Sequence, residues 1–144
     1  MSDPLHATLM AFREDGAWRG LLLRGPSGAG KSDLALRLMG RGWRLVADDR
    51  VLVWSSGGAA WGRAPDVLWG LLEIRGVGVL SVPVLRLAEI VAVADCVKPA
   101  AELDRTPLPE TTDMAGVRLP LRRISPLESA APDKLAAFCG ARRV

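Results

Sequence analysis

An eight-residue stretch near the N-terminus combines the residue types that bind phosphate groups. It reads Gly25–Pro26–Ser27–Gly28–Ala29–Gly30–Lys31–Ser32 and matches the pattern G-x-x-x-x-G-K-[ST] at every position. The glycines allow backbone N–H groups to turn inward around phosphate oxygens, where a Cβ would obstruct them. Lys31 supplies a positive charge to the outer phosphates, and the Ser32 hydroxyl is placed to hold Mg²⁺. These residues predict a loop that binds a nucleoside triphosphate or a related phosphate donor.

The flanking residues predict the elements that such a loop requires. The apolar run 20–24 is typical of a buried strand and leads directly into the loop. After Lys31, apolar residues recur at helical spacing as far as Gly40, so we expect a helix whose N-terminus faces the phosphates. Residues 44–47 then read as a second strand. The order strand, loop, helix, strand indicates an α/β domain and argues against a chance glycine-rich turn.

Two adjacent carboxylates, Asp48 and Asp49, follow that second strand. In a domain with a phosphate-binding loop, an Asp at a strand end faces the phosphates and can hold the metal. Two carboxylates also allow a division of labour, in which one holds Mg²⁺ and the other accepts the proton of an attacking hydroxyl. The alternative is a solvated turn, where Asp is common. The complete loop nearby favours the functional interpretation.

Four further residues are weaker candidates when they are taken by themselves. Glu73 and Arg75 interrupt an apolar run, and strand alternation would place both on one face. Such charges need a partner or a metal, and the residue types leave a structural ion pair and a functional site equally open. His6 is the single histidine, and a single histidine is more often structural than catalytic. Arg105, taken by itself, is an exposed loop cation.

Other elements follow from apolar runs and from turn residues. We expect strands at Thr8–Phe12, Val51–Trp54 and Ile90–Ala94, and strands with tight turns across 67–84. The segment 99–120 is rich in Pro, Thr and acidic residues and is expected to be a surface loop. A terminal helix is expected at 132–140.

The composition indicates a globular chain and gives no specific support for nucleic-acid binding. Its 144 residues suit one domain, with 49% hydrophobic and 24% charged residues. The net charge of +3 fits an anionic substrate or an acidic partner. No dense basic run with interleaved aromatic residues supports nucleic-acid binding. Cys96 and Cys139 lack metal-binding spacing and are expected to be buried free thiols. Without a signal peptide or an apolar run of about 18 residues, a cytoplasmic protein with no membrane span is expected.

Three stretches of the sequence, taken together, resemble the HPr kinase/phosphorylase family, specifically its C-terminal catalytic domain. They are the phosphate-binding loop, residues 41–51 (RGWRLVADDRV) and residues 72–79 (LEIRGVGV). The loop is shared with many enzymes, whereas the other two stretches are much more specific. Their order and spacing also resemble the family, and the resemblance extends over residues 5–95.

The resemblance implies an α/β P-loop kinase core with a mixed sheet, similar to that of phosphoenolpyruvate carboxykinase, and a hexamer. Members of the family use ATP and Mg²⁺ to phosphorylate a seryl hydroxyl of HPr, the phosphocarrier protein of the sugar phosphotransferase system. Many members also reverse this reaction by phosphorolysis. We therefore expect a single P-loop kinase domain over residues 1–144 that acts as an HPr serine kinase.

The same resemblance implies roles for individual residues. Asp49 would be the base in phosphorylation and the acid in the reverse reaction, with Asp48 beside it. Lys31 would contact the phosphates, and Ser32 and Glu73 would be on the metal. His6 matches a family histidine that precedes the strand before the loop. Arg105, within Leu103–Asp104–Arg105, is similar to a family loop that carries a functional arginine.

Three departures from the family pattern qualify these expectations. Family members commonly carry an additional N-terminal domain, and this chain resembles the compact versions found in some Gram-negative bacteria. Asp33 stands where Glu is usual. Residues 125–134 lack the basic Pro-Gly-Arg-Asn-like stretch associated with the reverse reaction, so phosphorolysis is expected to be weak. The alternatives are a P-loop small-molecule kinase and a non-catalytic nucleotide-binding regulatory module, and the intact set Lys31, Ser32, Asp49 and Glu73 argues against the module.

Overall fold

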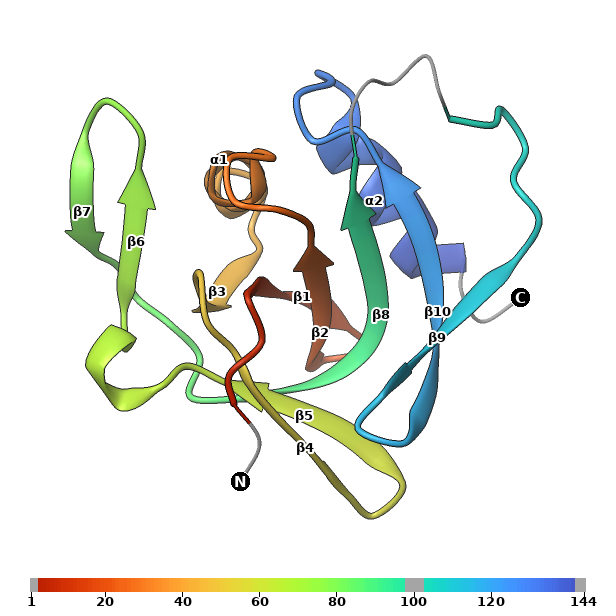
Figure 1. Cartoon of the computed structure of the whole chain (residues 1–144), viewed down its shortest axis with the longest axis horizontal. Coiled ribbons are helices and arrows are strands. Elements are labelled where there is room, and N and C mark those ends of the chain that lie inside the picture. Colours follow the sequence, from red (N-terminus) through yellow and green to blue (C-terminus); the bar gives the residue numbers. More distant parts are fainter. Residues whose placement is uncertain (1–2, 98–102, 142–144) are drawn as a thin grey trace.

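The computed structural model describes residues 3–97 and 103–141, which form an α/β fold around a large mixed sheet (Figure 1). In chain order the strands are β1 (Ala7–Glu14), β2 (Ala17–Arg24), β3 (Arg44–Ala47), β4 (Leu52–Ser56), β5 (Ala59–Arg63), β6 (Leu71–Ile74), β7 (Gly78–Ser81), β8 (Ala88–Cys96), β9 (Glu110–Met114) and β10 (Val117–Ile124). The helices are α1 (Lys31–Met39) and α2 (Ala131–Ala141), and a short 3₁₀ turn spans Asp66–Leu68. The expected α/β class and mixed sheet are confirmed.

The order of the strands gathers several strand ends at one edge of the sheet. The main order is β3-β1-β2-β8-β10-β9, with β2, β8 and β10 mutually parallel. Because the antiparallel β1 lies between β2 and β3, those two strands also run in the same direction. The carboxyl ends of β2, β3 and β8 therefore lie at the same edge as the amino end of β1. In open α/β sheets, ligands bind at the carboxyl ends of the parallel strands.

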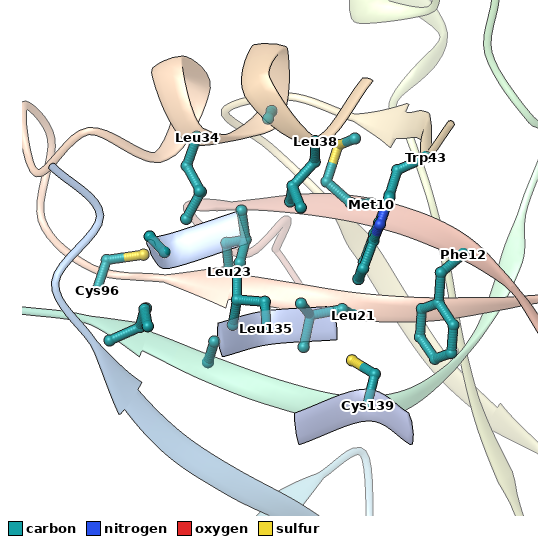
Figure 2. Close-up of a cluster of buried hydrophobic side chains, with 14 of the residues drawn as sticks. Met10, Phe12, Leu21, Leu23, Leu34, Leu38, Trp43, Cys96, Leu135 and Cys139 are labelled. Carbon is teal, nitrogen blue, oxygen red and sulfur yellow. The ribbon is translucent and has the colours of Figure 1, made fainter. Parts of the chain in front are cut away.

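Alternating side chains on the central strands supply a core on each side of the sheet. On β2, Leu21 and Leu23 pack against the two helices, through residues such as Leu34 of α1 and Leu135 of α2 (Figure 2). Leu22 points to the other side, into a second cluster that includes residues of the β4–β5 hairpin. The strands are apolar on both sides because both sides are covered.

Most of the expected elements are present. The bounds of β1, α1, β3 and α2 lie within two residues of those expected, whereas β2 begins three residues earlier than expected, at Ala17. The segment 67–84 contains the 3₁₀ turn and the β6–β7 hairpin, as expected for strands with tight turns. The strand β5, which pairs with both β4 and β8, was not indicated by the sequence. Neither helix in the described ranges is long and apolar enough to span a membrane.

The expectation of a surface loop over 99–120 was wrong for its second half. Glu110–Met114 forms β9, and Val117–Ile124 forms β10, which pairs in parallel with β8. Ala115 and Gly116 make the turn between them with φ of 52° and 84°. The polar residues of β9 occupy an edge strand, where one side faces solvent, so polarity and proline content were poor guides to structure there. Residues 99–102, in the first half, lie outside the described residues.

Candidate active site

The phosphate-binding loop connects the carboxyl end of β2 to the amino end of α1. Gly25, Gly28 and Gly30 have φ of 149°, 82° and 106°, which side-chain-bearing residues rarely adopt. A Cβ at Gly25 would lie 2.8 Å from the carbonyl oxygen of Cys96 on the neighbouring strand β8. The first glycine is therefore required both by backbone conformation and by the close approach of β8. The loop and the helix N-terminus form a cradle that suits a polyphosphate.

Lys31 is buried at the mouth of this cradle, with 6% of its surface exposed. Its ammonium Nζ donates to the carbonyl oxygens of Gly25 at 2.6 Å and Pro26 at 2.9 Å. Burial lowers the pKa of Lys31, and negative charge at Cys96, Asp49 and Asp48 opposes that shift. Since burial raises the pKa of the Cys96 thiol to about 12, that thiol is neutral near pH 7. Asp49 and Asp48 therefore remain the neighbouring groups whose negative charge opposes the effect of burial on the pKa of Lys31.

Asp48 is buried and receives hydrogen bonds from three separate parts of the chain. Its Oδ1 accepts from Ser32 Oγ at 2.8 Å and from Thr8 Oγ1 at 3.0 Å, and its Oδ2 accepts from the backbone N–H of Glu73 at 3.4 Å. A hydroxyl and a carboxylate in contact beside a phosphate cradle are hard oxygen ligands, which Mg²⁺ prefers. Among the described residues no three His, Cys, Asp or Glu side chains cluster as a metal site. A P-loop metal needs only this hydroxyl and carboxylate, because the phosphates supply further ligands.

Asp49 differs from its neighbour in exposure and in partners. Its side chain is 56% exposed, and its backbone adopts φ of 70°. Its Oδ1 lies 3.3 Å from His6 Nδ1 and 3.3 Å from Arg50 Nη1. Arg50 Nη1 also contacts His6 Nδ1, so the side chains of His6, Asp49 and Arg50 lie together. An exposed carboxylate next to a cation is available to an incoming hydroxyl.

The sequence left two roles open for Glu73 and Arg75, a structural ion pair and a functional site. The two side chains do not form an ion pair with each other. Glu73 lies on β6 with an exposed side chain, and Arg75 lies in the turn that follows β6. Neither side chain has an ion-pair partner in the parts of the chain that are described. The backbone of Glu73 reaches Asp48, so the β6–β7 hairpin flanks the Ser32–Asp48 pair. The role of Glu73 on the metal stays a prediction.

Arg105 lies apart from these residues. It lines an open cavity of about 510 Å³ together with Arg122, Arg123, Phe138 and other residues of β10 and α2. None of the residues that line this cavity belongs to the phosphate-binding loop or to the Asp48–Asp49 pair. The structure therefore brings together Lys31, Ser32, Asp48, Asp49 and His6, whereas a catalytic role for Arg105 stays a prediction.

Comparison with known proteins agrees with this arrangement. A family model described as the HPr Serine kinase C-terminal domain matches residues 3–122. The chain belongs to this family. The match contains the loop, both aspartates, His6, Glu73 and Arg105.

Individual relatives support the assignment to the HPr Serine kinase C-terminal domain family. The HPr kinase/phosphorylase of Streptococcus sanguinis is 40% identical over 116 residues, which cover 73% of this chain and 37% of that protein. The HPr kinase/phosphorylase of Clostridium perfringens strain SM101 is 47% identical over 66 residues, which cover 46% of this chain and 22% of that protein. The solved Hpr(Ser) kinase/phosphatase structure from Coxiella burnetii matches with a TM-score of 0.83 and 27% identity, covering 99% of this chain and 97% of that one. This chain thus spans well under two thirds of the length of the two curated relatives.

Two residues near the site were missed by sequence reasoning. Thr8 sits at the start of β1 and donates to Asp48, and Arg50 contacts both Asp49 and His6. Arg50 follows the aspartate pair directly and lies inside one of the stretches that resemble the family, so a signal was available. Thr8 gave no signal, because its contact depends on β1 pairing with β3 across 40 residues of sequence.

Replacement of Gly25 by alanine is expected to weaken nucleotide binding and to destabilise the fold. The new Cβ would meet the backbone carbonyl of Cys96 at 2.8 Å, and backbone cannot move aside as a flexible side chain does. Overpacking of this kind costs about 1–3 kcal/mol. Gly57→Ala is the matched control, because Gly57 has φ of 61° in an open turn with no atom within 4 Å of its Cβ position. Equal affinities of both variants for a fluorescent ATP analogue would contradict the role given to Gly25.

The two cysteines are expected to resist alkylation in the folded protein. Cys96 is 2% exposed and Cys139 is 1% exposed, and neither forms a disulfide. With the pKa of Cys96 raised to about 12, its thiolate fraction at pH 8 is about 10⁻⁴. Iodoacetamide at pH 8 should leave the native chain unmodified by mass spectrometry and should modify both thiols in denaturant. Rapid labelling of Cys96 in the native protein would show that the strand end beside the loop opens.

Proposed function

We propose that this chain is an ATP- and Mg²⁺-dependent protein kinase that phosphorylates a seryl hydroxyl of HPr. The observation that carries the proposal is the meeting of a complete phosphate-binding loop with a buried Ser32–Asp48 pair and an exposed Asp49. The names of the relatives, HPr kinase/phosphorylase, supply the protein substrate. The loop alone would support any nucleotide-dependent phosphotransferase.

The residues of the site would have two kinds of role in phosphoryl transfer, which are binding of the phosphates and the metal, and proton transfer. Backbone N–H groups of the loop and the Lys31 ammonium would hold the phosphates and neutralise their charge. Ser32 and Asp48 would hold Mg²⁺, with Glu73 beside them, and the bound metal would neutralise charge on the outer phosphates. Asp49 would accept the proton of the seryl hydroxyl. At the same time the seryl oxygen would bond to the γ-phosphorus, and the bond between the γ-phosphorus and ADP would break. Arg50 and His6 would orient the Asp49 carboxylate.

The decisive experiment is a phosphorylation assay with labelled ATP, Mg²⁺ and HPr. Label is expected on one serine of HPr, located by mass spectrometry, and absent from HPr in which that serine is replaced by alanine. Chelation of Mg²⁺ should abolish the transfer. Transfer to small metabolites but not to HPr would replace this proposal with the small-molecule kinase. Nucleotide binding without any transfer would replace it with the regulatory module.

Homo-oligomer formation is part of the proposal through the family resemblance, which implies a hexamer. Sedimentation equilibrium of the purified chain is expected to give a mass near six times its 15.4 kDa. A monomer that phosphorylates HPr at full rate would separate the activity from the assembly.

The reverse reaction is expected to be weak compared with phosphorylation. The segment that differs from the family lies against the loop, since a Cβ at Gly30 would lie 3.2 Å from the side chain of Leu127 and 3.4 Å from that of Pro126. Carbonyls of Pro126 and Glu128 also accept from Arg37 of α1, so this segment is tied to the helix, and its lysine, Lys134, pairs with Glu128. Phosphate release from serine-phosphorylated HPr should be much slower than the forward transfer at matched concentrations. Comparable rates would show that phosphorolysis does not need the missing basic stretch.

A further inference from the structure

The last residue of β2 and its partner on β8 form a two-pronged ion pair beside the phosphate-binding loop. Arg24 donates from Nε to Asp95 Oδ1 at 2.7 Å and from Nη2 to Asp95 Oδ2 at 3.1 Å. Its third nitrogen, Nη1, donates to Thr112 Oγ1 of β9 at 3.2 Å. Both charged side chains are about two-thirds buried, with 31% and 28% exposed. Parallel guanidinium–carboxylate bonds of this kind fix orientation as well as distance.

This ion pair is joined to the loop through the backbone on both strands. Arg24 and Asp95 are directly opposite each other in the parallel register of β2 and β8. The next residues along the two strands are Gly25 and Cys96, whose backbones approach so closely that only glycine fits. The carbonyl of Gly25 in turn accepts from the Lys31 ammonium. The Arg24–Asp95 bonds are therefore one residue away from the carbonyl that holds Lys31.

We propose that Arg24 is a positioning residue whose two bonds to Asp95 set the first turn of the phosphate-binding loop for nucleotide binding. By strand alternation Arg24 follows Leu22 onto the side of the sheet away from the helices, so it does not enter the phosphate cradle itself. It acts through Gly25, whose path it holds against β8. The inference rests on one part of the proposed function, which is that the loop binds a nucleotide.

The physical reason is the geometry that the loop requires. Gly25 adopts φ of 149°, and glycine restricts its own backbone less than any other residue. The conformation at Gly25 must therefore be held by its surroundings. Backbone pairing of β2 with β8 ends at Arg24, so the side chain of Arg24 extends the connection between the strands at the point where the backbone leaves the sheet.

A second ion pair between the same strands offers a matched control. Arg19 of β2 contacts Glu89 of β8 at 3.4 Å, with 36% and 29% of the side chains exposed, and it also lies 3.9 Å from Glu14 of β1. This pair has similar exposure and the same residue classes, but it lies five residues earlier on β2, at the opposite end of the strand from the loop. A purely structural contribution to strand pairing should be shared by both pairs, whereas positioning of the loop belongs to Arg24 alone.

The test measures nucleotide affinity and thermal stability of the full chain in parallel. The variants are Arg24→Met, Asp95→Asn, their double variant, Arg24→Lys and Arg19→Met. The probe is a fluorescent ATP analogue with Mg²⁺, so the readout does not depend on HPr. Arg24→Met and Asp95→Asn are each expected to weaken affinity about tenfold, and the double variant should be no worse than either, because interacting residues are not additive. Arg19→Met should change affinity less than about twofold, since it does not share a partner with the loop.

Arg24→Lys keeps the charge and loses the planar fork, so an intermediate loss of affinity is expected. It also serves as the test if Arg24→Met fails to fold. Unchanged affinity in folded Arg24→Met or Arg24→Lys would overturn the inference, as would an equal loss in Arg19→Met. Absence of nucleotide binding by the unmodified chain would overturn the proposed function, and the inference with it, which is a result distinct from the other two.

Discussion

Replacement of Lys31 by alanine is expected to reduce phosphoryl transfer to HPr by at least about 10²–10³-fold, the usual effect of deleting a charge-stabilising group from a preorganised site. The Lys31 ammonium is the cation closest to the cradle carbonyls of Gly25 and Pro26, and outer phosphates would take over those contacts when a nucleotide binds. No other lysine in the described ranges lies in the loop.

The fold of the Lys31→Ala variant is expected to survive. Removal of the ammonium loses two hydrogen bonds, which destabilises the fold. It also removes a charge whose burial is unfavourable, as the lowered pKa of Lys31 indicates. The two effects oppose each other, so unfolding free energy should change by no more than about 1–2 kcal/mol. Lys134→Ala is the control, because Lys134 is exposed on α2 and pairs with Glu128. A folded Lys31→Ala chain with the rate of the Lys134→Ala chain would remove the basis for the proposed site.

Replacement of Asp49 by asparagine is expected to lower turnover about 10²–10⁴-fold, which is the range for loss of a general base. Asparagine is the suitable substitution because it tolerates the φ of 70° that Asp49 adopts, whereas most side chains would add backbone strain. Affinity for the nucleotide should be nearly unchanged, since the side chain of Asp49 is exposed and makes its contacts with His6 and Arg50.

The same replacement at Asp48 is expected to act differently. Asp48 is an acceptor for Ser32, Thr8 and the N–H of Glu73, so an amide nitrogen at Oδ2 would face another donor. A buried polar mismatch costs about 1–3 kcal/mol of stability. Asp48→Asn should therefore lower thermal stability and raise the Mg²⁺ concentration needed for activity, with a smaller loss of turnover at saturating Mg²⁺.

Turnover, nucleotide affinity and unfolding temperature of both variants at saturating Mg²⁺ distinguish the two roles. Asp66→Asn, in which a 90% exposed carboxylate is neutralised far along the chain from the loop, controls for the loss of one negative charge. If Asp48→Asn is folded, binds nucleotide normally and has the more severe loss of turnover, the roles of the two aspartates must be exchanged.

Several features of this protein follow from the sequence by itself because they depend on local conformation. The strand, loop and helix over residues 17–39 lie where glycine positions and helical spacing place them. The expected strand Arg44–Ala47 agrees with β3, and the two aspartates follow it directly. A phosphate-binding loop can be recognised from sequence because it binds phosphate mainly through its own backbone. All the residues that set its conformation therefore lie in one short segment.

Only the tertiary structure decided which side chains meet at the site. The contacts of Asp48 with Thr8, of Asp49 with His6, and of Arg24 with Asp95 each join residues that are 40 or more positions apart. They exist because β1 enters the sheet between β2 and β3, and because β8 pairs with β2 in one register. Register is a property of the assembled sheet, and a shift by one residue would turn each of these side chains to the other face. The same cause explains why β9 was mistaken for a loop, since an edge strand is stabilised by its neighbour β10 and not by an apolar pattern of its own.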